Sequence, residues 1–230
     1  LNDPTQINAA NQWEYGNAIA QVGRYIYAIR GEGQTMWKYD MVSGDWEVEI
    51  KGTTPVEVTE TVGRGAIMLY PGKGNLIYVL VGNRKKSFYS YNVQTQTWNP
   101  LQTCSVTVNV SGSKMIYPGF GEYIYYLQGS SYWYKDESYT MLRYKMGGSW
   151  EELTPSSLGI DKPGTLAYAG DEYFYVTQGY DRRNFTKYYA FCFGDYISEI
   201  SEVDKHSGWG LIDWTDNSLQ SLDIGVRTGN

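Results

Sequence analysis

The chain has 230 residues, which is enough to bury a sizeable core as one domain or one repeat array. Its net charge of −6 argues against general nucleic-acid binding, which needs a positive surface to displace counterions from phosphate. No run of about 18 apolar residues is present, so we predict no membrane span in this chain. The 23 Tyr, 8 Trp and 26 Gly favour pleated sheets joined by tight turns.

Residues 1–15 are polar and precede any repeat, so we predict an N-terminal arm or a closing strand there. From residue 16 onward, a seven-residue pattern ending in Gly occurs four times, over 25–31, 76–82, 123–129 and 173–179. Its closing glycines are 51, 47 and 50 residues apart, and each copy has a central Tyr, at Tyr27, Tyr78, Tyr125 and Tyr175. This near-constant spacing indicates one structural unit repeated along the chain.

Further elements recur around each copy of this pattern. A small apolar segment that ends in a Gly turn precedes it, over 18–23, 66–72, 115–119 and 166–170. An aromatic strand follows it, over 37–39, 89–91, 142–144 and 189–191. A Trp comes next in three copies, as Trp46, Trp98 and Trp150, whereas Ile197 holds that place in the fourth. We interpret the repeated Trp as packing between neighbouring units rather than as a binding site.

These elements define four units, at about 16–62, 63–110, 111–160 and 161–201. Side chains alternate along their strands, which is typical of half-buried antiparallel strands. A four-stranded unit of this size cannot bury its own faces, so neighbouring units must stack, and radial stacking gives a propeller. We therefore predict an all-β fold, a β-propeller-like array of about four four-stranded antiparallel blades.

The order of a Gly-ended strand, a spaced Tyr and then a Trp, as in Gly82, Tyr91 and Trp98, resembles the kelch repeat. The resemblance covers roughly residues 16–201, and each copy has one Gly where kelch strands usually end in two. Kelch-like proteins commonly have six or seven blades. The resemblance therefore implies that blades are missing from this chain, that the propeller is small, or that another subunit completes it.

Residues 202–230 no longer follow the repeat, and the alternation over 222–227 predicts a C-terminal β extension. This stretch resembles the start of a β-sandwich module of the kind found in large bacterial or archaeal surface proteins.

Two cysteines and two sequons bear on the compartment. A disulfide between Cys104 and Cys192 would fit an oxidising compartment, although two buried free thiols are slightly favoured because the cysteines fall in different units. The triplets that begin at Asn109 and Asn184 permit N-glycosylation. These features are consistent with an extracellular or cell-surface glycoprotein.

Residues suited to catalysis are few. His206 is the one histidine, which excludes a histidine-activated nucleophile or a multi-histidine metal site, and we expect no metal and no cofactor. Carboxylates such as Asp40 and Asp45 lie in predicted turns, where they are expected to accept main-chain hydrogen bonds. Glycoside hydrolysis by carboxylates facing each other across the central channel is a weaker alternative. We predict that the protein is not an enzyme.

The longer connections between the second and third strands share one edge of the predicted propeller, and loops on a rigid scaffold often carry binding residues. Their basic and aromatic side chains can stack on sugars or anchor a protein partner. The candidate binding residues are Arg84, Lys85, Lys86, Tyr132, Trp133, Tyr134, Tyr180, Arg182 and Arg183. Loop solubility and packing of tyrosines along blade edges explain these residues equally well.

We expect a non-catalytic extracellular or cell-surface scaffold that acts through protein or glycan contacts. A protein partner or self-association is favoured, as in a secreted adhesive protein or a self-assembling filament subunit. The alternative is a carbohydrate-recognition module of a larger carbohydrate-active enzyme.

Overall fold

The computed structural model describes residues 16–31, 33–34, 36–50, 61–109, 113–130, 140–153, 164–170, 173–177 and 185–189. These residues form strands and turns, with no helix among them. In particular, the described part of the chain contains no helix long and apolar enough to cross a membrane. The predicted arm at 1–15 and the predicted extension at 202–230 lie outside the described residues.

The strands form four antiparallel sheets, which are the blades, and in each sheet strands that follow one another in sequence are neighbours. Blade 1 contains β1 (Ala18–Val22), β2 (Tyr25–Ile29), β3 (Met36–Asp40) and β4 (Asp45–Ile50). Blade 2 contains β5 (Ile67–Leu69), β6 (Leu76–Leu80), β7 (Phe88–Asn92) and β8 (Thr97–Pro100). Blade 3 contains β9 (Lys114–Ile116), β10 (Tyr123–Leu127), β11 (Met141–Lys145) and β12 (Trp150–Glu152). Blade 4 has three described strands, β13 (Thr165–Tyr168), β14 (Tyr173–Thr177) and β15 (Phe185–Tyr189).

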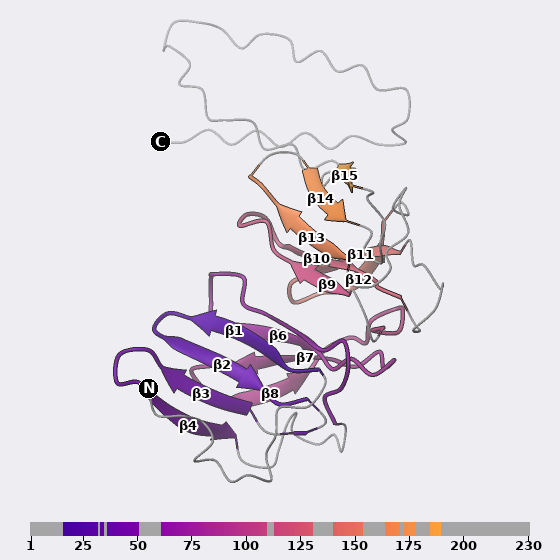
Figure 1. Ribbon diagram of the computed structural model, residues 1–230. Coiled ribbons are helices and arrows are strands. Elements are labelled where there is room, and N and C mark those ends of the chain that lie inside the picture. Colours follow the sequence, from indigo (N-terminus) through magenta and orange to yellow (C-terminus); the bar gives the residue numbers. More distant parts are fainter. Residues whose placement is uncertain are drawn as a thin grey trace, which may run out of the picture.

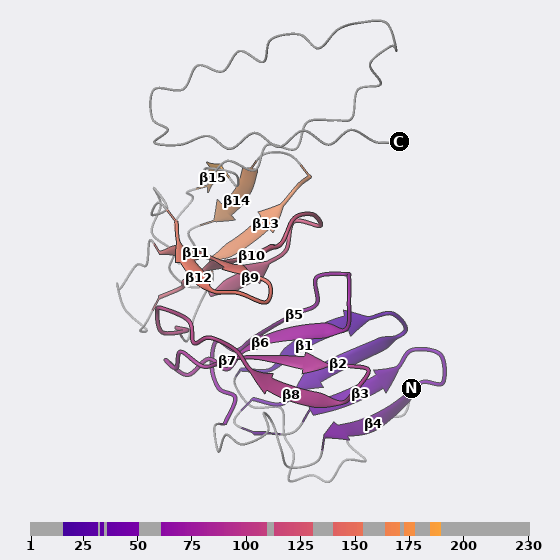
Figure 2. The same ribbon diagram turned by 180° about the vertical axis from the view of Figure 1, so that it is seen from behind.

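The blades stack in sequence order as a four-bladed propeller arrangement (Figure 1). The first strands of successive blades lie beside one another, β1 with β5, β5 with β9, and β9 with β13. Blades 1 and 4 therefore stand at the two ends of the array, as both views show (Figures 1 and 2). This arrangement confirms the predicted all-β array of antiparallel blades.

Each blade has two faces, because side chains alternate along every strand. We call the face that carries the central Tyr of the second strand the forward face, and the opposite one the rear face. In blade 2, Tyr78 lies on the forward face and pairs with Ser90, whereas Ile77 lies on the rear face and pairs with Tyr91. The same register holds in the other blades, so positions can be compared from one blade to the next.

The core lies between blades, where the forward face of one blade packs on the rear face of the next. The first cluster joins Tyr27 and Ile29 of blade 1 to Ile77 and Tyr91 of blade 2. A second cluster joins blade 2 to blade 3, and a third joins blade 3 to blade 4. Each fully buried large apolar side chain contributes roughly 1.5–3 kcal/mol through removal from water. The stacking of blades is therefore what holds the fold together.

The repeated Trp residues behave as the sequence predicts in the two inner blades. Trp98 is buried between blades 1 and 2, and Trp150 packs between blades 2 and 3 with its ring centroid 4.9 Å from that of Phe88. Trp46 occupies the same position on the rear face of blade 1, where its ring lies 5.0 Å from that of Tyr39.

The third strand of the last unit begins earlier than the sequence pattern predicts. The expected aromatic segment was 189–191, whereas β15 spans Phe185–Tyr189. Tyr188 pairs with Phe174 and so takes the place that Tyr39 has in blade 1. The prediction was wrong because several aromatics follow one another here, and aromatic spacing alone cannot choose among their registers. Ile197 lies outside the described residues.

Candidate functional site

The basic loop of blade 2 joins β6 to β7 and carries the three candidate binding residues that the structure describes. Arg84 and Lys86 are exposed and Lys85 is half-buried. The loop turns at Asn83 and Arg84, which adopt left-handed conformations with φ of 52° and 61°. Gly82 precedes them with φ 73°, and a Cβ there would lie 2.5 Å from the backbone nitrogen of Ala66. Only glycine fits at this crossing, which fixes where the loop turns.

Main-chain hydrogen bonds hold this loop against the segment that leaves β8. The Arg84 N–H donates to the Val108 carbonyl at 3.0 Å, and the Val108 N–H donates to the Lys85 carbonyl at 2.7 Å. The Cys104 N–H donates to the Lys86 carbonyl at 2.8 Å. The ammonium Nζ of Lys86 also donates to the Ser105 carbonyl at 2.7 Å. The backbone under these cations is therefore preorganised, which lowers the entropy cost of binding an anionic group.

Six of the nine predicted binding residues belong to other connections of the chain. Tyr132, Trp133, Tyr134, Tyr180, Arg182 and Arg183 lie outside the described residues. Their convergence with Arg84 and Lys86 stays a prediction.

Asn109 is poorly placed to carry a glycan. Its side chain is buried, and its Nδ2, the atom to which a glycan would be attached, donates to the Gly129 carbonyl at 2.6 Å. Glycosylation leaves one hydrogen on Nδ2, but the attached sugar would need room that this buried side chain lacks. The structure thus argues against the Asn109 prediction, whereas Asn184 lies outside the described residues.

Cys104 is a buried free thiol in the core between blades 2 and 3. Burial raises the pKa of its thiol to about 11, since a charged thiolate is poorly solvated there. The neutral thiol is a weak nucleophile, which suits a packing role. Cys192 lies outside the described residues, so the pairing of the two cysteines is not tested.

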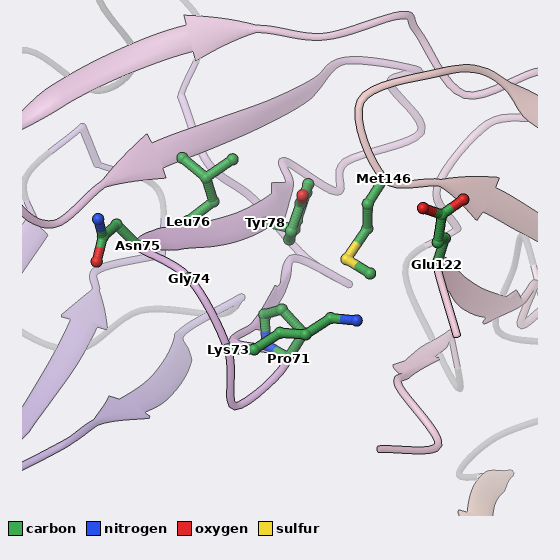
Figure 3. A pocket seen from close by; sticks show the side chains of 8 residues that line it. All are labelled: Pro71, Lys73, Gly74, Asn75, Leu76, Tyr78, Glu122 and Met146. Atoms are coloured by element: carbon green, nitrogen blue, oxygen red, sulfur yellow. The ribbon is translucent and has the colours of Figure 1, made fainter. Parts of the chain in front are cut away.

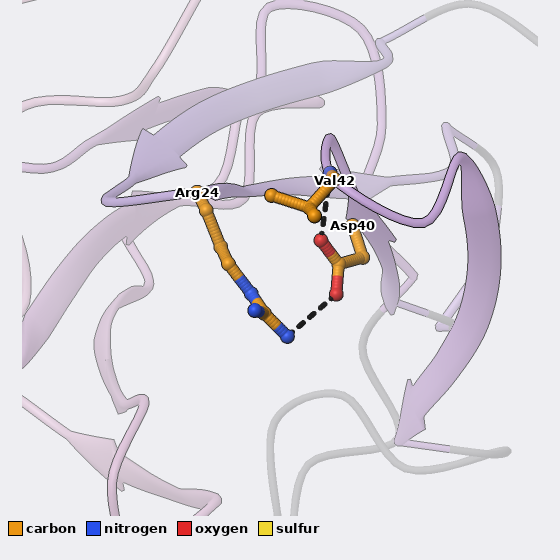
Figure 4. A network of polar contacts seen from close by, with 3 residues as sticks. All are labelled: Arg24, Asp40 and Val42. Carbon is orange, nitrogen blue, oxygen red and sulfur yellow. Dashed lines mark hydrogen bonds and ion pairs between the residues drawn. The ribbon is translucent and has the colours of Figure 1, made fainter.

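Asp40 is the last residue of β3 rather than a turn residue, and it illustrates what a carboxylate beside a turn does (Figure 4). Its Oδ1 accepts a hydrogen bond from the Val42 N–H at 2.9 Å, and its Oδ2 lies 2.8 Å from the Arg24 guanidinium. In blade 2 the amide oxygen of Asn92 accepts the equivalent bond from the Gln94 N–H at 2.9 Å. Because a neutral amide makes the same bond at the equivalent position, the hydrogen bond to the turn is sufficient to account for a polar side chain at residue 40, and no carboxylate chemistry is needed.

A pocket of about 360 Å³ lies at the opposite edge of the array, between the short turns of blades 2 and 3 (Figure 3). Its apolar lining includes Leu76, Tyr78 and Met146, and its polar lining includes Asn75 and Glu122. Burial raises the pKa of Tyr78 to about 12, so its hydroxyl is neutral at ordinary pH. Apolar surface beside a few hydrogen-bonding groups is the usual composition of a small-molecule site.

A lysine bridges the two turns beside this pocket. Lys73 of blade 2 donates from Nζ to the Gly121 carbonyl of blade 3 at 2.6 Å, and its Nζ lies 5.0 Å from the centre of the Tyr117 ring. Sequence reasoning placed the binding residues on the other edge and missed this pocket. The spacing of the repeat could have indicated it. Lys73 and Gly121 are 48 residues apart, which is about one repeat, so they lie in equivalent turns of successive blades. Such turns are neighbours in a stacked array.

No group of three or more His, Cys, Asp or Glu side chains within the described ranges is arranged to hold a metal ion.

Comparison with protein-family models and with curated proteins finds no match to this sequence. Solved structures do share its fold. The structure of YjhT has a TM-score of 0.53 and 13% identity, with 70% of this chain and 58% of that chain covered. The computationally designed Ika8 protein has a TM-score of 0.47 and 10% identity, covering 75% of this chain and 45% of that one. This chain therefore matches less than two thirds of the length of either, and the likeness to YjhT shows the fold alone.

Proposed function

We propose that the protein is a non-catalytic extracellular or cell-surface scaffold, built on a kelch-like propeller, that acts through protein or glycan contacts. One observation carries the proposal: the basic loop of blade 2 presents Arg84 and Lys86 on a backbone fixed by hydrogen bonds to the neighbouring segment. The chain as a whole is acidic, with a net charge of −6, so this basic loop is a region of opposite charge. Such a loop suits a partner with carboxylate or sulfate groups.

The test is direct binding of the full chain to arrays of carboxylated and sulfated glycans and to acidic peptides. The double variant Arg84→Gln, Lys86→Gln removes both exposed charges while keeping side chains of similar length. We expect its affinity to fall at least about tenfold, since each charge-assisted contact typically contributes 1.5–3 kcal/mol.

Lys114→Gln is the matched control, because it removes an exposed charge from β9 and should leave affinity unchanged. Equal binding by the wild-type chain and the double variant would contradict the proposal, and so would the absence of binding to every acidic probe. Labelling of intact cells of the source organism with a membrane-impermeant reagent tests the surface location separately.

The pocket between blades 2 and 3 supports a second candidate, a carbohydrate-recognition module of a larger carbohydrate-active enzyme. Sugar rings present both apolar C–H faces and hydroxyls, and the pocket offers Leu76 and Met146 beside Asn75 and Glu122. Titration with neutral oligosaccharides, followed by NMR, should perturb signals of Met146 and Leu76. Glu122→Gln should weaken such binding and leave binding of acidic glycans unchanged, whereas Arg84→Gln should do the reverse.

A further inference from the structure

The rear face of blade 1 exposes a position that is buried in every other blade. The second residue of the first strand pairs with the fourth residue of the second strand in all four blades. It is 7–8% exposed in blades 2 to 4, where it packs against the preceding blade, as Met68, Met115 and Leu166. In blade 1 the residue at this position is Ile19, and it is 66% exposed.

The forward face of blade 4 shows the converse. The first residue of the third strand is 0–1% exposed in blades 1 to 3, where it packs against the next blade, as Met36, Phe88 and Met141. In blade 4 the residue at this position is Phe185, which is 66% exposed. The central Tyr175 beside it is half-buried, whereas its three equivalents are each 4% exposed.

Both end faces already have the geometry of the internal interfaces. On blade 1 the rings of Tyr39 and Trp46 lie 5.0 Å apart at 47°, and Tyr91 and Trp98 on blade 2 lie 5.0 Å apart at 49°. On blade 4 the rings of Tyr175 and Phe185 stack at 5.7 Å and 18°. Their equivalents on blade 2 stack at 5.9 Å and 20°. The aromatic pairs on the two end faces therefore have the ring geometry of the internal interfaces.

Charge does not oppose contact between these two faces. Lys187 on the forward face of blade 4 lies over the Tyr173 ring, 4.0 Å from its centre. In blade 3 the guanidinium of Arg143 lies over Tyr123 at 4.1 Å on a forward face that is packed against blade 4. The position of Lys187 over the Tyr173 ring is thus compatible with another blade packed against this face.

We propose that the forward face of blade 4 binds the rear face of blade 1 in a second copy of this chain, head to tail. Phe185 of one copy takes the position that Phe88 has inside the chain, where its ring centroid lies 4.9 Å from those of Tyr144 and Trp150. Its neighbours in the second copy are then Tyr39 and Trp46. On that face Ala28 and Trp37 are already buried, so the surface that docks comprises Ile19, Ile26, Tyr39 and Trp46.

A second copy is the partner that this pair of faces fits, because the chain itself joins the same two faces three times. The interface is heterologous, since two different surfaces meet, and such contacts close into a ring or continue as a filament. Two copies would bring together about eight blades, which is within the usual range of closed propellers. A second copy of the chain is thus one partner of the proposed scaffold. The inference rests on the proposed function only in assuming that the protein acts through contacts with proteins.

Sedimentation velocity on the full chain, over a range of concentrations, is the test. Wild-type protein should form dimers or longer assemblies, whereas Ile19→Asp and Phe185→Asp should each raise the dissociation constant at least about tenfold. Both substitutions are at exposed positions, so circular dichroism should show unchanged folding. Val42→Asp is the matched control, because Val42 is 74% exposed but lies in the turn after β3 and outside both faces.

Mixing the two variants separates head-to-tail contact from a symmetric one. Ile19→Asp keeps an intact blade 4, and Phe185→Asp keeps an intact blade 1, so an equimolar mixture should form dimers that neither variant forms alone. A monomeric wild-type chain, or assembly that either substitution leaves unchanged, overturns the inference. A monomer that still binds acidic glycans through Arg84 and Lys86 would overturn it while leaving the proposed scaffold function intact.

Discussion

Truncation of Phe88 to alanine should destabilise the protein far more than the same change at Phe185, although the two residues hold the same position in different blades. Phe88 is 1% exposed, and its ring centroid lies 4.9 Å from those of Tyr144 and Trp150 and 5.9 Å from that of Tyr78. Removing a buried Phe ring typically costs about 3–5 kcal/mol, through lost transfer free energy and the cavity left behind.

The ring of Phe185 is mostly in water, so its removal loses little transfer free energy within one chain. We expect a change in the free energy of unfolding within about 0.5 kcal/mol for Phe185→Ala, measured on dilute, monomeric protein. The assay is urea unfolding followed by tryptophan fluorescence and by circular dichroism. Coincidence of the two transitions checks that the array unfolds as one unit.

The difference between the two variants is the decisive quantity. Equal destabilisation by Phe88→Ala and Phe185→Ala would refute the assignment of Phe185 to an exposed face of blade 4. At higher protein concentration the wild-type chain should gain stability through assembly, and Phe185→Ala should lose that gain.

Three further predictions concern single residues. Gly82→Ala should lower the free energy of unfolding by more than about 1 kcal/mol, because the new Cβ would meet the backbone at 2.5 Å and φ is 73°; urea unfolding measures it. The pKa of Cys104 is raised to about 11, so the folded chain keeps this proton after the unfolded chain, with a thiol pKa of about 8.5, has lost it. Stability is therefore lost as pH rises from about 8.5 to 11, by about 3 kcal/mol, and Cys104→Ala should remove that part of the alkaline loss in urea titrations at several pH values. Asp40→Ala should cost about 1 kcal/mol by leaving the Val42 N–H without its acceptor, whereas Asp40→Asn should cost less, which thermal unfolding of both variants checks.

The strand pattern of each blade could be predicted from the sequence because it depends on residues that are close together in the chain. The central Tyr residues and the Gly that closes each second strand recur within segments of seven residues, and alternation then gives each strand its two faces. The repeated Trp was correctly assigned to packing between units for Trp98 and Trp150, since a residue that recurs with the repeat serves the contact that recurs with it.

Other features depend on contacts that no local pattern encodes. Asn109 reads as a sequon, yet its amide is buried against the Gly129 carbonyl, 20 residues further along the chain. The pocket beside Lys73 is formed by turns of two different blades, so neither turn alone predicts it. Exposure of Phe185 is likewise invisible in the sequence, because Met36, Phe88 and Met141 hold the same strand position and are buried by contacts with another blade.

The end blades should also differ from the inner blades in how readily they open. In a stacked array each unit is stabilised by its neighbours, and blades 1 and 4 each contact one neighbouring blade within the described chain, whereas blades 2 and 3 each contact two. Amide hydrogen exchange should therefore be faster in β14 than in β6 and β10, although all three are second strands of their blades. Head-to-tail assembly gives blade 4 a second neighbour, so protection of β14 should rise with protein concentration while that of β6 stays constant. Concentration-independent exchange in β14, in a sample shown to be assembled, would place the intermolecular contact somewhere other than the forward face of blade 4.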